Sequence, residues 1–257
     1  MSTPRGPATA TAGNAIQAPG TPENLWAAWP ATSAFPELDL SGLRRVLVVA
    51  AHPDDEVLGL GGTIVRLAAA GALLRLVSVT DGEASHPDST SPTAQDLPRV
   101  RAAETRAALV ALGAGGTEIV RLRLPDTGLA DHEQELAARL ARLADGFDAI
   151  AAPWIHDVHN DHEAAGRAAL TAGRTIGVSV LQYPVWTWHW SRPDDPRVPW
   201  DRAARIPLGP GDLRRKRAAL DCFASQLRPL GPAPADAAVL PPAEIAHFLR
   251  DYETVLR

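Results

Sequence analysis

Val46-Leu47-Val48-Val49-Ala50-Ala51-His52-Pro53-Asp54-Asp55-Glu56 is the stretch of sequence that decides the fold of this chain. Its first part is apolar and rich in β-branched residues, as in a strand buried on both faces of a parallel sheet. Its second part places a histidine and three acids directly after that strand. In open α/β sheets, functional sites form at the carboxyl ends of the strands. We therefore expect a site where the apolar run ends.

Strand and helix patterns alternate along the chain from Arg45 onward. The expected strands are 46–50, 74–80, 118–122, 149–152 and 178–183. Helical patterns lie between them at 57–70, 99–112, 132–144 and 163–174. Short strands separated by helices of this length predict right-handed crossovers and a mostly parallel sheet covered on both faces. The fold class is therefore α/β, a Rossmann-like three-layer sandwich.

The C-terminal part departs from this alternation. After Tyr183 we expect a Trp- and Pro-rich loop over 184–210 and a helix over 212–226. A Pro-rich connection and a last helix near 242–256 complete the expected decoration by loops and helices. The whole domain is expected to span residues 45–257.

The N-terminal part precedes the expected domain. Residues 1–22 contain little to bury, which predicts a disordered tail. Residues 23–44 carry Trp26 and Trp29 between prolines. They predict an extension that packs on the domain surface or on a partner subunit, so a homo-oligomer is a further hypothesis.

Composition narrows the classes of protein and partner. The chain has 257 residues, of which 46% are hydrophobic, and a formal net charge of −5. This charge attracts neither nucleic acid nor a membrane surface, so neither is expected as a partner. The single cysteine, Cys222, excludes an intramolecular disulfide and a cysteine-based zinc site. The sequence shows no export signal and no apolar run of about 18 residues, which predicts a soluble cytoplasmic protein.

Two clusters of metal-binding residue types follow expected strands. His52 and Asp55 lie three residues apart at a strand-to-helix turn, and His162 follows the apolar run 149–153. A parallel sheet brings such loops together, and catalytic zinc sites usually have three protein ligands and an open position. We expect His52, Asp55 and His162 to bind one Zn²⁺, although two histidines and a carboxylate also suit Fe²⁺.

Neighbouring residues suggest hydrolysis of an amide. Asp54 is the expected general base, because it lies beside Asp55 and metal coordination lowers the pKa of a bound water to about 7. A cationic His159 is expected to stabilise the oxyanion and to protonate the leaving amine. Asp161 or Asp157 is expected to hold His159 in the required tautomer.

Both clusters resemble motifs of a known family. The stretch from Ala51 to Glu56, with the glycines after it, resembles the first motif of the PIG-L/LmbE-like deacetylases, and His159-Asn160-Asp161-His162 resembles the second. The resemblance covers residues 45–230 and implies a zinc-dependent N-acetylglucosaminyl deacetylase. It implies these roles: zinc ligands His52, Asp55 and His162, base Asp54, and oxyanion-stabilising acid His159.

The chain departs from the family pattern at two positions. Asn160 replaces the proline of the common His-Pro-Asp-His form, which affects only the stiffness of that loop. Asp157 stands where some members carry a tyrosine, so any step assigned to that tyrosine does not transfer.

Five further residues are candidates for contacting the substrate. Trp188 and His189 lie in a tryptophan-rich segment, and indole faces stack well on sugar rings or apolar aglycones. Arg101, Glu83 and Asp126 match weaker family features between the two motifs. Each has a structural alternative: tryptophans that close the sheet edge, an exposed helix arginine, and acids that form turns.

The glycines of the first motif and several absent motifs restrict the class of enzyme. Gly59, Gly61 and Gly62 lack the spacing of a dinucleotide fingerprint, so we expect close helix packing instead. The sequence contains neither an H-E-x-x-H zinc motif nor a G-x-S-x-G nucleophile elbow.

The sequence therefore predicts a metal-dependent hydrolase that removes an N-acyl group, foremost acetyl, from an amino sugar. The substrate is expected to be a small glycoconjugate or a glycosylated natural product. A metal-dependent amidase acting on a non-sugar amide, such as a thiol conjugate, would use the same residues. A non-catalytic carbohydrate-binding protein is the alternative from another class, and the intact catalytic set argues against it.

Overall fold

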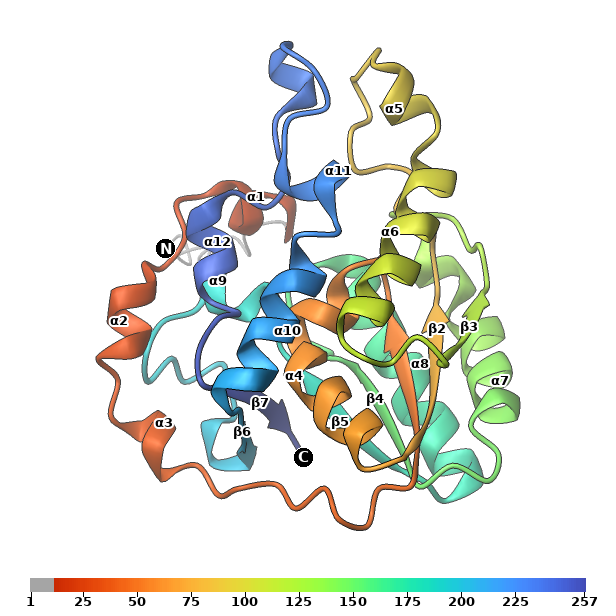
Figure 1. Ribbon diagram of the computed structural model, residues 1–257, viewed down its shortest axis with the longest axis vertical. Helices are drawn as coiled ribbons and strands as arrows, with labels where there is room; N and C mark the ends of the chain where they lie inside the picture. The colour runs from red at the N-terminus through yellow and green to blue at the C-terminus, as the bar shows by residue number, and fades with distance from the viewer. Residues whose placement is uncertain (1–11) are drawn as a thin grey trace, which may run out of the picture.

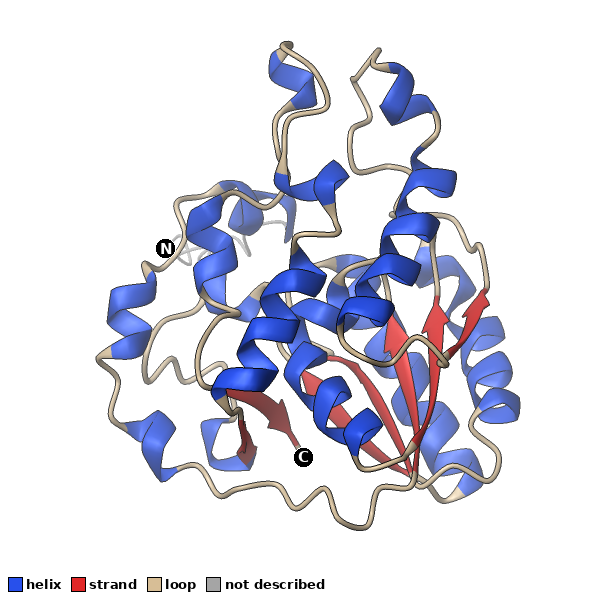
Figure 2. Ribbon diagram, viewed as in Figure 1, coloured by secondary structure: helices blue, strands red, loops and turns tan. Residues whose placement is uncertain are grey.

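The computed structural model describes residues 12–257 and contains a seven-stranded sheet flanked by helices (Figures 1 and 2). The strands lie in the order β3-β2-β1-β4-β5-β7-β6. Their bounds are β1 (Arg45–Ala50), β2 (Leu73–Ser78), β3 (Glu118–Arg121), β4 (Ala149–Pro153), β5 (Ser179–Tyr183), β6 (Ala203–Pro207) and β7 (Tyr252–Leu256). β1 to β5 are parallel, whereas β7 is antiparallel to both β5 and β6. The expected mostly parallel sheet is confirmed.

Helices cover both faces of the sheet, and alternate apolar side chains of the inner strand β1 enter the two separate cores between sheet and helices. Val46 and Val48 contribute to a core shared with α4, α6 and α10, whereas Leu47 and Val49 face α7 and α8. The bounds of these helices are α4 (Asp55–Ala69), α6 (Leu97–Ala111), α7 (Glu133–Leu143), α8 (Asn160–Ile176) and α10 (Pro210–Leu220). Figure 1 shows the resulting three layers. Within residues 12–257, no helix has the length and apolar character needed to cross a bilayer.

The C-terminal region contains two strands that the sequence analysis assigned to other structure. Residues 203–207 were expected in a loop and form β6, and the helix expected near 242–256 was wrong beyond its first turn. Only α12 (Pro242–Ala246) is helical there, and β7 follows it. β7 was not recognisable as a strand because two of its buried residues, Glu253 and Thr254, are polar. The helix expected over 212–226 divides into α10 and α11 (Ala224–Leu227).

Glu253 is buried because it binds a break in α4. Leu60 has non-helical angles (φ −136°, ψ 15°), and the N–H groups of Gly62 and Thr63 donate to the Glu253 carboxylate at 2.7 Å each. Lys216 Nζ donates to the same carboxylate at 2.7 Å and to the carbonyl of residue 58 at 2.8 Å. This buried ion pair joins α4, which begins at the candidate site, to the antiparallel edge of the sheet.

Two glycines of α4 allow other elements to approach its backbone closely. A Cβ on Gly59 would lie 2.2 Å from the ring of Tyr183, and a Cβ on Gly62 would lie 2.5 Å from Leu208. Both distances are shorter than van der Waals contact. The prediction that these glycines serve helix packing is confirmed.

The N-terminal extension packs on the C-terminal part of the same chain. The ring of Trp26 lies 5.1 Å from that of Trp188, and the ring of Trp29 lies 4.9 Å from that of Trp200. Trp26 and Trp29 are both buried in this cluster. The two indoles that suggested self-association therefore pack within one chain.

The expected disordered tail is only partly covered by the described residues. Residues 1–11 lie outside them. The rest of that segment contains the short helix α1 (Ala12–Gln17), and the N–H of Thr21 donates to the carbonyl of His189 at 2.8 Å. No local sequence pattern signals this contact, because its partner lies far along the chain.

Replacing Lys216 by methionine should destabilise the fold strongly. The substitution leaves the buried carboxylate of Glu253 without its counter-charge, and removal of one partner of a buried ion pair costs about 3–5 kcal/mol. The free energy of unfolding from denaturant titration measures the loss. Arg99→Met is the matched control, because Arg99 pairs with Asp96 on the surface and such pairs contribute about 1 kcal/mol or less. Equal losses in both variants would contradict the role of the buried pair.

The carboxylate of Glu23 should make stability depend on pH. Burial alone would raise the pKa of Glu23, but hydrogen bonds and charges from Arg250 and His247 outweigh it and hold this pKa below the usual value of 4.5. The stabilisation is therefore present above pH 4.5 and is lost as the pH falls through the lowered pKa. We expect the difference in unfolding free energy between wild type and Glu23→Gln to shrink as the pH falls from 6 to about 3. A difference that stays constant over this range would count against the pairing.

Candidate metal centre and active site

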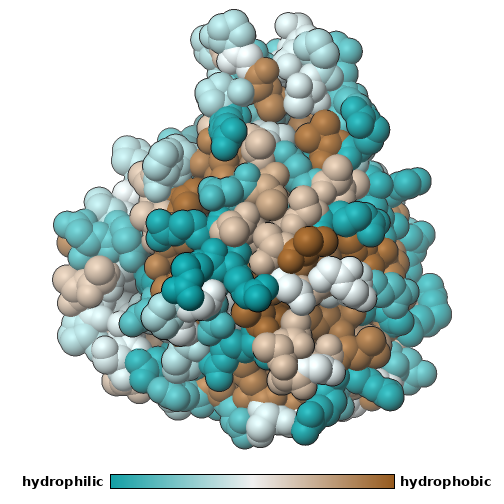
Figure 3. All heavy atoms as spheres, viewed as in Figure 1, coloured by the Kyte–Doolittle hydropathy of each residue, from teal (hydrophilic) through white to brown (hydrophobic). Residues whose placement is uncertain are grey.

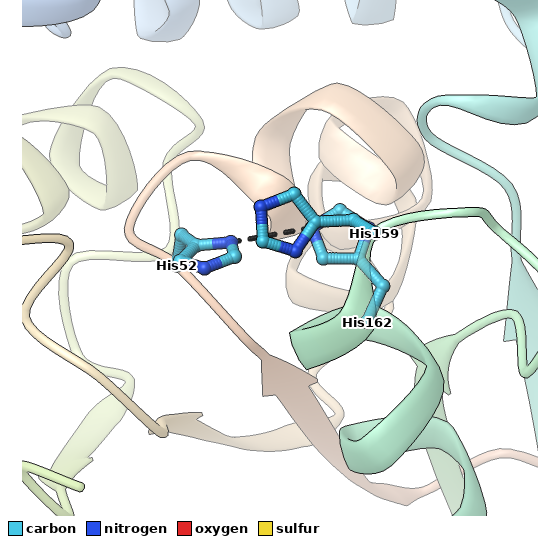
Figure 4. Close-up of side chains that lie close together, drawn as sticks. All are labelled: His52, His159 and His162. Atoms are coloured by element: carbon cyan, nitrogen blue, oxygen red, sulfur yellow. Dashed lines mark hydrogen bonds between the residues drawn. The ribbon is translucent and has the colours of Figure 1, made fainter. Parts of the chain in front are cut away.

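The candidate metal centre lies where the loops after β1 and β4 meet. These strands are parallel neighbours, with Val46 opposite Ala149, so their carboxyl ends lie side by side. His52 follows β1, and His159 and His162 lie at the start of α8, after β4. Figure 4 shows the three imidazoles gathered at this point, with His52 and His162 joined by a hydrogen-bond contact.

One nitrogen of His52, one nitrogen of His162 and the two carboxylate oxygens of Asp55 lie at the spacing expected around one metal ion. Nδ1 of His52 lies 3.2 Å from Nε2 of His162 and 3.6 Å from Oδ2 of Asp55. Nε2 of His162 lies 3.2 Å from Oδ1 of Asp55. Ligand atoms about 2.0–2.2 Å from a tetrahedral zinc ion are about 3.3–3.6 Å from one another. The donor set therefore fits one divalent cation.

The second nitrogen of each imidazole is held by carboxylates. Nδ1 of His162 donates to Asp157 Oδ2 at 2.7 Å, and Nε2 of His52 lies 3.2 Å from both Asp126 Oδ1 and Asp161 Oδ2. A neutral imidazole that donates through one nitrogen carries its lone pair on the other. Hence Nδ1 of His52 and Nε2 of His162, the nitrogens that face Asp55, carry the lone pairs available to a metal ion.

The surrounding carboxylates make a cation favourable at this point. Burial lowers the pKa of His52, but Asp126 and Asp161 outweigh it and raise that pKa well above its usual value. Burial likewise lowers the pKa of His162, and Asp55 outweighs it, so the pKa is about 9. A divalent cation between the two rings would supply the positive charge that protons otherwise supply.

The other nitrogen of His52 belongs to a second group of ligand type. Nε2 of His52 and the carboxylates of Asp126 and Asp161 also lie within 4.8 Å of one another. Asp161 already accepts N–H groups of residues 127 and 129 at 2.7 and 3.1 Å. This group therefore orients His52 through hydrogen bonds, and the group with Asp55 and His162 is the better place for the metal.

Asp54 lies beside the ligands with its backbone under strain. Its φ of 124° falls where residues with a side chain are rare. Its N–H donates to Glu56 Oε2 at 3.1 Å, and Arg101 Nη2 donates to its Oδ2 at 3.0 Å. Burial raises the pKa of Asp54 to about 7; Arg101 opposes this rise and Asp55 reinforces it. A carboxylate with a pKa near neutrality suits general-base catalysis.

His159 is the N-cap residue of α8, and its imidazole is held there by the helix. The backbone N–H of Asp161 donates to its Nδ1 at 3.3 Å, so the neutral ring carries its proton on Nε2. Burial and the positive charges of His52 and His162 lower the pKa of His159 to about 2. The structure therefore favours a neutral N–H donor over the cation that the sequence analysis expected.

These residues form the floor of a cavity of about 730 Å³. The floor is polar and includes His52, Asp54 and His162. The walls include the N-terminal residues 16–20 and the loop 238–241. This volume lies within the range of about 300–1,000 Å³ that small-molecule sites occupy.

The sequence around this cavity matches a known family. The PIG-L model, described as GlcNAc-PI de-N-acetylase, matches residues 47–173, which contain both site motifs. The chain belongs to this family. A relative from Tsukamurella paurometabola, a 1D-myo-inositol 2-acetamido-2-deoxy-alpha-D-glucopyranoside deacetylase, is 31% identical over 184 residues. The match covers 58% of this chain and 62% of that relative, so the chain spans about three fifths of the relative's length.

Solved structures share the fold of this chain. The conserved protein TT1542 from Thermus thermophilus is 29% identical with a TM-score of 0.53, and the match covers 72% of this chain and 80% of that one. The A40926 pseudoaglycone deacetylase Dbv21 is 20% identical with a TM-score of 0.61, and the match covers 83% of this chain and 96% of that one. At this low identity, the similarity to Dbv21 shows the fold alone.

The carboxylates of the two acids near the second PIG-L motif contact His52 and His162, not His159. Asp161 was expected to orient His159 with its carboxylate, but that carboxylate contacts His52, and only its backbone reaches His159. Asp157 was the other candidate, and its carboxylate binds His162. The sequence could not distinguish these partners, because all three histidines lie within reach of the same turn.

Two of the expected substrate-binding residues lie outside the cavity wall. Trp188 is buried, with its ring packed edge-to-face on Trp26, because it belongs to the tryptophan cluster of the core. Trp186, two residues earlier, lines the cavity instead. Glu83 is exposed and accepts the N–H of Asp126 at 3.0 Å, so it fixes a turn.

Arg101, Asp126 and His189 do line the cavity, but protein groups already engage them. Arg101 is buried, not the exposed helix arginine that was the alternative, and donates to the carbonyl of Gly82 at 3.0 Å as well as to Asp54. His189 Nε2 donates to the carbonyl of residue 18 at 2.9 Å. Direct contact of these three residues with a substrate stays a prediction.

Asp157→Asn should weaken metal binding. The Asp157 carboxylate accepts hydrogen bonds from His162 Nδ1 and from backbone N–H groups of residues 185, 186 and 187. The side-chain NH₂ of an asparagine would face some of these N–H donors and could not accept their hydrogen bonds. Loss of such hydrogen bonds to a metal-binding histidine typically lowers metal affinity by about 10–100-fold. Competition with a chelator measures the affinity, with Asp145→Asn, an exposed acid away from the cavity, as the matched control. An affinity equal to wild type would show that Asp157 does not orient His162 for the metal.

Proposed function

We propose that this protein is a metal-dependent N-deacetylase of an N-acetylated amino sugar. The observation that supports this most directly is the convergence of His52, Asp55 and His162 at metal-ligand spacing beside Asp54. The family model and the deacetylase relatives agree with this chemistry. We propose Zn²⁺ as the metal because the nitrogen and oxygen donors suit it, with Fe²⁺ as the alternative.

His52, Asp55 and His162 would hold the metal, which supplies Lewis acidity and lowers the pKa of water at the site. Asp54 is positioned to take a proton from the attacking water, because its raised pKa makes it an effective base near neutrality. Arg101 holds the carboxylate in place at 3.0 Å. Asp54 lines the cavity from a strained backbone conformation, with a φ of 124°.

His159 would stabilise the oxyanion that forms when water adds to the amide carbonyl. Its Nε2 carries the proton, because Nδ1 accepts the N–H of Asp161. A neutral imidazole donates this hydrogen bond without first being protonated. The proton taken up by Asp54 is then available for the leaving amine, so that water and amide yield a carboxylate and a free amine.

The substrate class follows from the relatives and the cavity. The relative from Tsukamurella paurometabola acts, by its name, on an acetamido-deoxy-glucopyranoside. The cavity of about 730 Å³ is large enough for a small glycoconjugate. We therefore propose an N-acetylglucosamine conjugate as the substrate.

A substrate panel tests the proposed function. The purified protein, reconstituted separately with Zn²⁺ and Fe²⁺, would be assayed for acetate release from glycosides of N-acetylglucosamine and from simple N-acetyl amides. We expect release from the glycosides. Faster release from non-sugar amides would favour a general amidase. Sugar binding without acetate release under either metal would favour a carbohydrate-binding protein.

Asp54 and His162 should separate catalysis from metal binding. Asp54→Asn should keep the metal content of wild type and lower kcat by about 10²–10⁴-fold, because only the base is lost. His162→Ala should lose the metal, since it removes a ligand. Elemental analysis and acetate release on both variants make the comparison. Full activity of Asp54→Asn, or full metal content of His162→Ala, would contradict the assigned role.

A further inference from the structure

We propose that the outer part of the cavity is an apolar compartment that binds a hydrophobic group carried by the amino-sugar substrate, and that the N-terminal residues 16–20 form one of its walls. This inference rests on the proposed function of the polar floor. It adds that the part of the substrate beyond the amino sugar is hydrophobic.

The lining of the cavity divides into a polar floor and a largely apolar rim. The rim is formed by Ile16 and Pro19 of the N-terminal segment, by Trp186, and by Val239 and Leu240 of the loop after η3 (Pro234–Asp236). The polar residues in these parts of the lining are Gln17, His189, Gln226 and Glu244, and both ring nitrogens of His189 already bond to protein groups. Because burial of apolar surface is favourable at about 25 cal/mol per Å², such a rim favours a hydrophobic group over a second sugar.

Hydrogen bonds fix the N-terminal segment in this position. Nε2 of His189 donates to the carbonyl of Ala18 at 2.9 Å, and Thr21 N–H donates to the carbonyl of His189 at 2.8 Å. Nδ1 of His189 lies 2.8 Å from Glu244, so this ring joins the segment to α12. A Cβ on Gly20 would lie 2.3 Å from the His189 ring, and only glycine allows this approach. The wall is therefore held in place without substrate.

The size of the cavity and the position of this wall in the sequence support the same conclusion. A cavity of about 730 Å³ exceeds what one monosaccharide fills and matches a ligand with an additional group. Residues 16–20 and 238–241 both lie outside the matched family region, 47–173. The polar floor thus lies within the family region, whereas the apolar rim is built largely by other parts of this chain.

The test compares substrates that differ only in a hydrophobic group. The metal-reconstituted full chain would be assayed for amine release from the methyl and octyl glycosides of N-acetylglucosamine, and from the N-octanoyl analogue of the methyl glycoside. We expect kcat/KM at least about tenfold higher for one octyl-bearing substrate than for the methyl glycoside, because each buried methylene strengthens binding. A preference for the octyl glycoside assigns the compartment to the aglycone, and a preference for the N-octanoyl substrate assigns it to the acyl chain. No preference for either overturns the proposal.

The double variant Ile16→Ser/Val239→Ser tests the residues of the wall. The preference is the kcat/KM for the octyl-bearing substrate divided by the kcat/KM for the methyl glycoside. We expect this ratio to fall about tenfold in the double variant, to a value near one. Val110→Ser is the matched control, because Val110 is 63% exposed on α6, whose outer surface carries hydrophobic side chains in Figure 3. Thermal unfolding verifies that all variants are folded. A preference that persists in the double variant, or that falls equally in the control, overturns the role of these two residues.

Failure of the proposed function would be recognised separately. If the metal-bound protein releases neither amine nor carboxylate from any substrate, the proposed deacetylase function is wrong. Equilibrium binding then tests, without turnover, whether the apolar compartment binds a hydrophobic group. Calorimetry should show the preferred octyl-bearing compound binding at least about tenfold more tightly than the methyl glycoside, with the difference lost in the double variant. Equal affinities in wild type would overturn the compartment as well.

Discussion

The structure of the site depends on the balance of charge around one point at the carboxyl edge of the sheet. Four carboxylates surround the imidazoles of His52 and His162, and all six side chains are largely buried. The carboxylates are those of Asp55, Asp126, Asp157 and Asp161. Buried carboxylates this close repel one another unless positive charge lies between them. The pKa values of both imidazoles are raised, so protons supply this charge when no metal is bound, and a divalent cation would supply it in the metal-bound protein.

The position of this point follows from the topology of the sheet. β1 and β4 are adjacent and parallel, so the loops that carry the ligands leave the sheet side by side. The break in α4 and its contacts with Glu253 and Lys216 fix the helix that begins with Asp55. A buried ion pair on the antiparallel side of the sheet thereby holds α4 at residues 58, 62 and 63, within about two turns of Asp55.

Much of this arrangement could be predicted from the sequence, and the remainder could not, for identifiable reasons. His52, Asp55 and His162 were predictable because each follows an apolar strand pattern at the same sheet edge. The partner of Asp157 was not predictable, because several histidines lie within its reach. β7 was missed because burial of Glu253 depends on Lys216, which is distant in sequence. The wall formed by residues 16–20 depends on contacts with His189 that no local pattern encodes.

Anomalous X-ray diffraction from crystals of the purified protein, recorded on both sides of the absorption edge of the bound metal, tests the central claim most directly. The account predicts a single strong peak bonded to Nδ1 of His52, a carboxylate oxygen of Asp55 and Nε2 of His162. A peak bonded instead to Nε2 of His52, Asp126 and Asp161 would contradict the assignment. Crystals grown with a divalent metal that show no peak at the site would contradict the metal centre itself.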